Sequence, residues 1–215
     1  MRTLIIPDIH NHVEAIESTI AKVKPNRTVF LGDYFDSFFD TVEMTDQTCK
    51  WLRSSLDKPN RIHLLGNHDI PYLFDFDGTW RKNGWSEEKN AIVRSYNMPI
   101  DKFKMSYFED GWLMTHAGID AELFKIESVD GAKDSCVEAL AALNAGREHP
   151  LLSDLGCLWI RWNRWEPTLC NQIFGHTAGD QIRERRKNGL TSICLDAPAR
   201  YAILEAGKIT YGYQK

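Results

Sequence analysis

Three short apolar runs in the first third of the chain each end in residues that commonly bind metals. The runs cover residues 3–6, 27–31 and 61–65, and they are followed by Asp8-Ile9-His10, Gly32-Asp33-Tyr34-Phe35-Asp36 and Gly66-Asn67-His68-Asp69. Apolar residues at helical spacing fill the intervals at 12–23 and 41–56, the second with Asp40 or Thr41 as its N-cap. Strands alternating with helices predict parallel strands and right-handed crossovers. In such sheets, functional residues usually lie at the carboxyl ends of the strands, and all three polar motifs lie there.

The second half of the chain has a different pattern. Residues 103–108 and 111–115 flank a turn and predict a hairpin, which ends at Thr115-His116-Ala117-Gly118. A helix rich in Ala and Leu is expected over about 132–146. Short strands follow near 171–174, 191–195 and 201–205, the first ending at Gly175-His176-Thr177. This half is expected to form a largely antiparallel second sheet. Without repeats or linkers, residues 1–215 are expected to form a single domain.

Charge and cysteine usage narrow the functional classes. The formal net charge of −4 gives no global basic field that would draw the chain to nucleic acid or membrane. No apolar run approaches the roughly 20 residues of a membrane span. The five cysteines are scattered and form no CxxC pair, which argues against a disulfide framework and favours packing roles in a reducing cytoplasm. We therefore expect a cytoplasmic protein, with nucleic acid an unlikely partner.

The polar residues at the strand ends have the chemistry of a site for two divalent metals. Oxygen and imidazole donors without thiolate suit manganese, our first expectation, with iron or zinc as alternatives. A carboxylate can bridge two cations, and the strand before Asp33 lies between the other two early motifs. We expect one metal on Asp8, His10 and Asp33, and a second metal on Asp33, Asn67, His116 and His176.

Each motif has a simpler explanation when it is taken alone. Asp8 and Asp33 suit strand-end turns, Asn67-His68-Asp69 suits a helix cap, and a single buried His is usually a hydrogen-bonded core residue. His12 and His63 lie outside the motifs and are expected to be surface or structural residues. The agreement of order, position and ligand type favours the dinuclear site.

In order and spacing, these segments resemble the calcineurin-like metallophosphoesterase superfamily. Its phosphoprotein-phosphatase-like branch, which includes serine/threonine phosphatases and symmetrical diadenosine tetraphosphatases, is the most similar part. The resemblance runs from residue 8 to about 196 and includes Leu158-Trp159-Ile160-Arg161 and Leu195-Asp196. It implies a four-layer α/β/β/α sandwich of two mixed β-sheets flanked by helices, with two metals at the sheet edge.

The resemblance also implies a reaction, the hydrolysis of a phosphate ester by a metal-activated hydroxide. It assigns His68 as the acid that protonates the leaving group and Asp36 as the residue that orients His68. One departure concerns the phosphate: the family usually has Arg after the second Asp of Gly-Asp-x-x-Asp, and here Ser37 follows Asp36. A hydroxyl cannot replace a bidentate guanidinium. Arg161 is the first choice for a compensating cation, and Arg164 is the second.

Several alternatives remain open at the level of sequence. The phosphorylated substrate is a phosphoprotein, a nucleotide or a small phosphoester; a phosphodiesterase and a non-catalytic scaffold with the same fold are the competing functions. The basic segment 183–187 is expected to be a solvated loop. Residues 75–88 are expected to form a loop after the His68 motif, where Trp80 or Trp85 would either stack on a nucleobase or pack into the protein.

Overall fold

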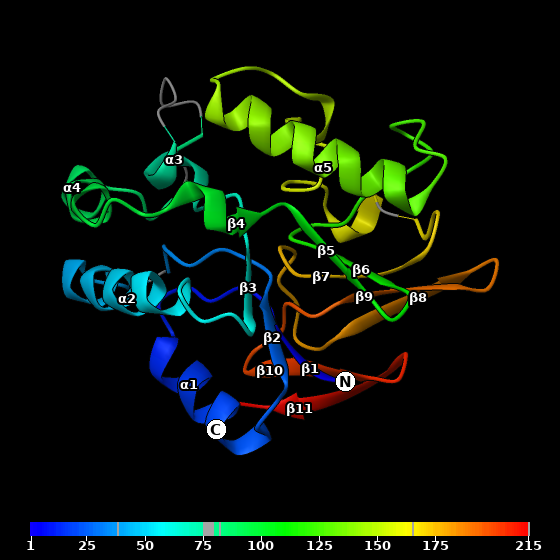
Figure 1. Cartoon of the computed structure of the whole chain (residues 1–215), viewed down its shortest axis with the longest axis horizontal. Helices are drawn as coiled ribbons and strands as arrows, with labels where there is room; N and C mark the ends of the chain where they lie inside the picture. Colours follow the sequence, from blue (N-terminus) through cyan, green and yellow to red (C-terminus); the bar gives the residue numbers. More distant parts are fainter. Residues whose placement is uncertain (38, 75–79, 82, 165, 215) are drawn as a thin grey trace.

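The computed structural model describes residues 1–37, 39–74, 80–81, 83–164 and 166–214 (Figure 1). The strands are β1 (Arg2–Ile6), β2 (Arg27–Phe30), β3 (Arg61–Leu64), β4 (Phe103–Lys104), β5 (Ser106–Glu109), β6 (Trp112–Thr115), β7 (Asn171–Phe174), β8 (Arg183–Lys187), β9 (Leu190–Cys194), β10 (Arg200–Glu205) and β11 (Lys208–Tyr213). The helices are α1 (Val13–Val23), α2 (Val42–Ser55), α3 (Ile70–Leu73), α4 (Glu87–Ser95) and α5 (Val129–Asn144). Short 3-10 turns cover Ile100–Lys102, Pro150–Leu152 and Trp162–Arg164.

The first sheet contains the predicted parallel strands. Its order is β11-β10-β1-β2-β3-β4, and the pairs β1/β2, β2/β3 and β3/β4 are parallel. Helices α1 and α2 connect β1 to β2 and β2 to β3, as the apolar spacing predicts. Thr41 caps α2, because its hydroxyl accepts a hydrogen bond from the Met44 amide at 3.3 Å. The carboxyl ends of β1, β2 and β3 therefore share one edge.

The second sheet is mixed, so the expectation of a largely antiparallel sheet was wrong. Its order is β5-β6-β7-β9-β8, in which β6/β7 and β7/β9 are parallel and the two edge pairs are antiparallel. Strand β10 pairs instead with β1 in the first sheet, and β11 pairs with β10. Apolar runs indicate where strands lie, but long connections leave the choice of partner to tertiary packing. The long segment between β6 and β7, which contains α5, allows a parallel crossover.

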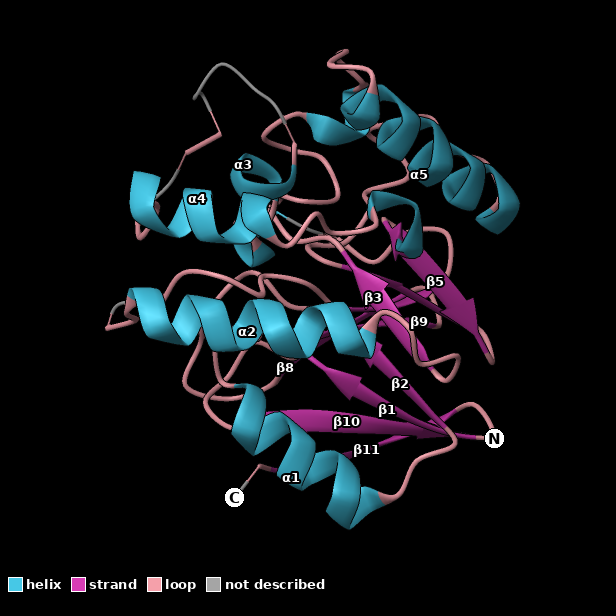
Figure 2. Cartoon of the chain, turned by 60° about the vertical axis from the view of Figure 1, so that its left-hand side comes forward, coloured by secondary structure: helices cyan, strands magenta, loops and turns pink. Residues whose placement is uncertain are grey.

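Alternating side chains on the strands build the layers. Along β1, Ile5 packs in a cluster with residues of β6, β7 and β9, which places it between the two sheets. Leu4 and Ile6 point the other way and share a cluster with Ile16 of α1 and Leu52 of α2. Helix α5 covers the second sheet on its outer side, whereas α1 and α2 cover the first (Figures 1 and 2). The predicted four-layer α/β/β/α arrangement is confirmed.

Two local predictions need correction or extension. Residues 183–187 form the edge strand β8 and not a loop, because they pair antiparallel with β9 along their whole length. Helix α4 begins directly after Ser86, whose hydroxyl accepts from the Lys89 amide at 3.2 Å, and ends at Ser95.

The five cysteines are free and buried, as expected for packing residues. No helix in the described ranges is long and apolar enough to cross a membrane.

His63 makes the fold sensitive to acid. Its ring is 2% exposed and lies between the Tyr34 hydroxyl (3.0 Å from Nδ1) and the Ser55 hydroxyl (2.9 Å from Nε2). Burial, together with the nearby charge of Arg61, lowers the pKa of His63 to about 3. The unfolded chain binds a proton near pH 6.5, so the stability contributed by neutral His63 is complete above that pH. It is lost progressively as the pH falls from 6.5 towards 3.

We therefore expect His63→Gln to flatten the acid dependence of unfolding. Between pH 6.5 and 5 the wild type should lose about 2 kcal/mol through this residue, and the variant should lose that much less. Urea titrations at both pH values measure the difference, with the exposed His12→Gln as the control. Identical pH slopes for the wild type and His63→Gln would show that His63 already accepts a proton in the folded protein.

Candidate metal centre and cavity

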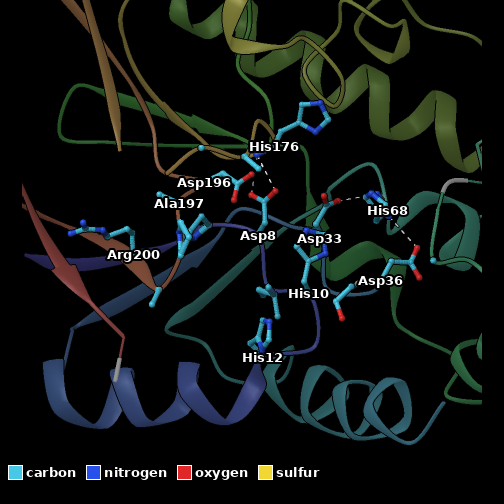
Figure 3. A pocket seen from close by; sticks show the side chains of 18 of the residues that line it. Asp8, His10, His12, Asp33, Asp36, His68, His176, Asp196, Ala197 and Arg200 are labelled. Atoms are coloured by element: carbon cyan, nitrogen blue, oxygen red, sulfur yellow. Dashed lines mark hydrogen bonds and ion pairs between the residues drawn. The ribbon is translucent and has the colours of Figure 1, made fainter. Parts of the chain in front are cut away.

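The predicted motifs converge at the carboxyl ends of five strands. The first three follow β1, β2 and β3, and the other two follow β6 and β7 of the second sheet. Figure 3 shows Asp8, His10, Asp33, His68 and His176 around one cavity. Segments separated by more than 160 residues meet here directly, since the His176 amide donates to both carboxylate oxygens of Asp8 at 3.0 Å.

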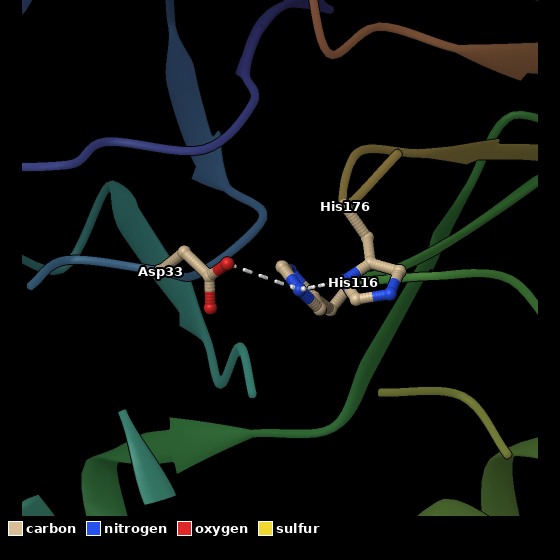
Figure 4. A group of neighbouring side chains, drawn as sticks. All are labelled: Asp33, His116 and His176. Atoms are coloured by element: carbon tan, nitrogen blue, oxygen red, sulfur yellow. Dashed lines mark hydrogen bonds and ion pairs between the residues drawn. The ribbon is translucent and has the colours of Figure 1, made fainter. Parts of the chain in front are cut away.

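Two groups of side chains have the spacing of metal-binding sites. In the first, Asp8, His10 and Asp33 offer ligand atoms that all lie within 4.8 Å of one another. In the second, Asp33, His116 and His176 do the same (Figure 4). Asp33 belongs to both groups, which is the geometry required of a bridging carboxylate.

Asn67 lies beside the second group. Its Oδ1 is 2.9 Å from Nε2 of His116, and its side chain is buried. The Asp33 Oδ2 approaches the same His116 nitrogen at 3.4 Å. The six residues predicted as ligands are therefore gathered in one place, and they offer the mixed oxygen and nitrogen donors that suit divalent manganese, iron or zinc.

Each candidate histidine has one ring nitrogen fixed by a backbone carbonyl. His10 Nδ1 lies 3.1 Å from the Phe35 oxygen, His116 Nδ1 lies 2.9 Å from the Leu31 oxygen, and His176 Nε2 lies 3.1 Å from the Trp159 oxygen. A carbonyl only accepts, so these nitrogens carry a proton, and in the neutral ring the other nitrogen keeps its lone pair. This carbonyl-to-imidazole arrangement orients metal-binding histidines in proteins.

The charges of the cluster also fit a cation. Burial raises the pKa of Asp8, and the Asp33 charge adds to this shift. Burial likewise opposes ionisation of Asp33, but four histidines outweigh it and lower the pKa of Asp33 to about 2. Burial lowers the pKa of His176 to about 3, with His116 contributing. Asp33 is thus ionised and His176 neutral, which are the forms in which these side chains bind metals.

Asp196 is a cavity residue with no role among those predicted from the sequence. It follows β9 and lines the same cavity as Asp8. Burial raises the pKa of Asp196 to about 8, and the charge of Asp8 contributes. The Leu195-Asp196 dipeptide is part of the family resemblance and follows a predicted strand. These two features could have indicated Asp196 as a residue of the site.

Asp69 holds two of the ligand-bearing loops together. Its carboxylate accepts hydrogen bonds from the backbone amides of Asp33 (2.9 Å), Tyr34 (2.7 Å) and Gly66 (2.8 Å). The alternative of a helix cap is wrong for this side chain, because Asp69 stands at the N-cap position of α3 but makes no capping hydrogen bond. It is fully buried and ties the end of β2 to the end of β3.

The ligands sit on sharply turned backbone. His10, Asp33 and His176 have positive φ values of 44°, 50° and 66°. For residues other than Gly, this left-handed conformation costs of order 1 kcal/mol each and is typically found at functional sites. Two motif glycines allow the close packing: a Cβ on Gly66 would lie 2.1 Å from Asp33 Oδ1, and a Cβ on Gly175 would lie 2.0 Å from Asp8 Oδ1.

His68 and Asp36 form the pair that the family resemblance implies. His68 Nδ1 lies 3.1 Å from Asp36 Oδ2, and the His68 amide donates to Asp33 Oδ1 at 2.9 Å. Burial alone would lower the pKa of His68, but the hydrogen bond to Asp36 and the charges of Asp33, Asp36 and Asp69 raise it to about 9. His68 is thus adjacent to both metal-ligand groups and belongs to neither.

The cavity has a volume of about 1090 Å³, and its described wall includes six aspartates, four histidines and two arginines. Ser37 lines it next to Asp36, and the arginines among the described lining residues are Arg161 and Arg200. Arg161 donates to the His176 carbonyl at 3.2 Å. Arg164, the second choice, is not among the described residues that line the cavity. The geometry therefore favours Arg161.

The segment predicted to follow the His68 motif as a loop is described only in part, because residues 75–79 and 82 lie outside the described ranges. Asn83 and Gly84 are its described residues on the cavity wall. Trp80 and Trp85 pack against the core, with the Trp80 ring 5.7 Å from that of Trp159. The positions of Trp80 and Trp85 therefore support packing into the protein over stacking on a nucleobase.

Comparisons with known proteins agree with this arrangement. A family model of calcineurin-like phosphoesterases matches residues 1–192. No curated protein matches the chain. Among solved structures, a cold-active protein-tyrosine phosphatase from a psychrophilic Shewanella species is similar with a TM-score of 0.68 and 14% identity, over 99% of this chain and 78% of that one.

Two further structures show the same likeness. A protein serine/threonine phosphatase from Saccharomyces cerevisiae has a TM-score of 0.59 at 14% identity, over 100% of this chain and 80% of its own. A metallophosphoesterase from Sphaerobacter thermophilus has a TM-score of 0.50 at 16% identity, over 100% of this chain and 89% of its own. At such identities the likeness is one of fold.

Proposed function

Because the chain belongs to the calcineurin-like phosphoesterase family, we propose that it is a dinuclear metal-dependent hydrolase of a phosphate ester. One observation carries the proposal: two groups of ligand atoms share Asp33, and the His68–Asp36 pair lies beside them on the same cavity. A non-catalytic scaffold would have no need to keep this pair next to an intact set of ligands. Phosphoprotein and dinucleoside polyphosphate remain the substrate classes of the proposal.

The residues divide naturally between the two cations. Asp8, His10 and Asp33 would hold one, and Asp33 would share the second with the residues Asn67, His116 and His176. Manganese is the first choice for both positions. When bound, such a pair supplies an activated water as the nucleophile and polarises the phosphoryl oxygens.

His68 supplies the proton that the leaving oxygen needs. With Nδ1 held by Asp36, its Nε2 is the nitrogen available to a substrate, and the side chain is 22% exposed. The raised pKa of His68, about 9, means that its imidazole carries a proton at neutral pH in this arrangement. An acid placed this way typically contributes 100- to 10,000-fold to a rate.

Arg161 is proposed to contact the phosphate. We expect Arg161→Ala to lower kcat/KM by roughly 10- to 100-fold, the value of a charge-assisted hydrogen bond. Arg164→Ala is the matched control, because this neighbour does not line the cavity. Steady-state kinetics of both variants on one monoester makes the comparison. A larger loss in Arg164→Ala than in Arg161→Ala would reverse the assignment.

A substrate panel tests the proposed function itself. Purified protein with manganese, iron, zinc or magnesium is assayed on p-nitrophenyl phosphate, a phosphodiester, a phosphopeptide and a diadenosine polyphosphate. Turnover that needs added metal and is lost with chelator supports the proposal, and the preferred ester gives the substrate class. No turnover on any ester with any metal, together with fewer than two metals bound at saturation, favours the scaffold.

A further inference from the structure

Lys89 of α4 is a buried lysine close to the candidate active site. The residue is 6% exposed, and its ammonium contacts Asp40 Oδ2 at 2.8 Å, the Gly84 carbonyl at 2.6 Å and Asp36 Oδ1 at 3.6 Å. Lysine is almost never this buried unless it is paired. Neither the metal-ligand groups nor the cavity wall includes Lys89 among the described residues.

The ammonium acts on the carboxylate that holds His68. Asp36 uses Oδ2 for His68 Nδ1, at 3.1 Å. Its Oδ1 accepts from the Tyr72 hydroxyl at 2.6 Å and faces Lys89. Asp36 is 2% exposed, so water has little access to solvate its charge. Among the described residues, Lys89 and His68 are the basic side chains within 4.0 Å of this carboxylate, and Lys89 lies outside the described cavity wall.

Lys89 also neutralises a second buried acid and fixes the cavity rim. The Asp40 side chain is 3% exposed, and the side-chain nitrogen Nδ2 of Asn11 donates to its Oδ2 at 3.0 Å. The contact with the Gly84 carbonyl pins a segment that lines the cavity. Gly84 packs so closely on Asp36 that a Cβ there would lie 2.8 Å from the Asp36 Cβ, and its φ is +100°.

We propose that Lys89 is a positioning residue for proton delivery, holding Asp36 correctly oriented so that His68 presents its proton to the leaving group. The inference rests on the proposed function. Without the ammonium, two buried carboxylates would be left with less compensation, and Asp36 would turn away from its present position. Its hold on the His68 ring would then weaken, while the metal ligands would keep their places.

A role in stability alone explains Lys89 poorly. Replacing a buried ion pair by well-packed apolar residues is often neutral or stabilising, so a buried Lys between two acids is weak evidence for a stabilising role. Outer partners that orient metal-binding histidines typically contribute 10- to 100-fold to activity, and we expect a similar magnitude for a residue that orients His68 through Asp36. Lys89 has the contacts of such a residue.

The test compares two esters that differ in their need for an acid. Phenyl phosphate releases a basic phenolate that must be protonated, whereas dinitrophenyl phosphate releases a phenolate that is stable without a proton. For Lys89→Met we expect kcat on phenyl phosphate to fall roughly 10- to 100-fold and kcat on dinitrophenyl phosphate to change little. KM and bound metal should stay close to the wild-type values.

Three further variants make the result decisive. Lys50→Met, which removes an exposed lysine paired with Asp46 at 2.6 Å, should leave both rates unchanged. In a His68→Ala background, Lys89→Met should have no additional effect on phenyl phosphate, because the residue acts through His68. The double variant Lys89→Met/Asp40→Asn also removes the charge of Asp40, which would otherwise lose its partner. It replaces Lys89→Met in the assays on both esters if the single variant folds poorly.

Two outcomes overturn the role of Lys89 while leaving the proposed function intact: equal losses on the two esters, or an additive effect in the His68→Ala background. A wild-type protein that hydrolyses neither these two esters nor any ester of the substrate panel would contradict the proposed function, and the role of Lys89 with it. Metal content measured on each variant separates these cases, since an equal loss caused by a damaged metal centre would appear as missing metal.

Discussion

Replacing Asp33 with Asn should remove both metals and lower turnover by roughly a thousand-fold or more, because a bridging carboxylate serves both cations. Asp33 is 2% exposed and is the one residue common to the two groups of ligand atoms found in the described part of the chain. An amide is nearly the same size but carries no charge and offers one acceptor oxygen where the carboxylate offers two. Elemental analysis of protein dialysed against manganese measures the loss directly.

Asp8→Asn is the matched control for this prediction. Asp8 belongs only to the group that contains His10. Its loss should therefore weaken the binding of one metal and leave the second metal bound through His116 and His176. The expected stoichiometries are therefore two for the wild type, one for Asp8→Asn and near zero for Asp33→Asn. Two metals retained by Asp33→Asn would rule out the bridging role and require separate sites.

The site was more predictable from sequence than the sheets around it. Side chains at the ends of parallel strands must meet, whatever the details of packing, so the spacing of Asp8, Asp33 and Asn67 after apolar runs was enough to predict a cluster. His116 and His176 reach the same place because β6 and β7 are parallel in the second sheet. Local chemistry and a simple rule of topology were sufficient here.

Other features depend on contacts that no local pattern records. β10 lies beside β1, and β11 lies beside β10, although β1 and these two strands come from opposite ends of the chain. Strand β8 is rich in charged residues because it is an edge strand, and edge strands commonly carry charge to prevent further pairing. Lys89 has the appearance of a surface lysine in sequence, and only the packing of α4 on the cavity rim buries it.

The supports of the site explain why its ligands tolerate strained backbone. His10, Asp33 and His176 adopt left-handed conformations, and each is held by several contacts. The His10 and Asp33 segments are joined by the bond from the His10 amide to the Asp33 carbonyl, at 2.8 Å. Asp69 fixes the Asp33 amide from the other side. Strain of this kind persists only where the surroundings over-determine the geometry, as they do here.

His68→Ala should lower kcat by roughly 100- to 10,000-fold on an ester with a basic leaving group, the usual contribution of a general acid. The variant should still bind two metals, because His68 belongs to neither group of ligand atoms. KM should change little, since the imidazole is assigned to the transition state. Kinetics on phenyl phosphate, together with metal analysis of the same sample, measures all three quantities.

The control for this prediction is a histidine on the same cavity wall. His12 lines the cavity but is exposed, and it caps α1 without a side-chain hydrogen bond, so His12→Ala should keep the wild-type rate. Dinitrophenyl phosphate then identifies the role of His68. If protonation is that role, the loss shrinks on this ester, whose leaving group is stable as an anion. An undiminished loss would mean that His68 holds the phosphate or the loop of Asn67, and the proton would have to come from another group.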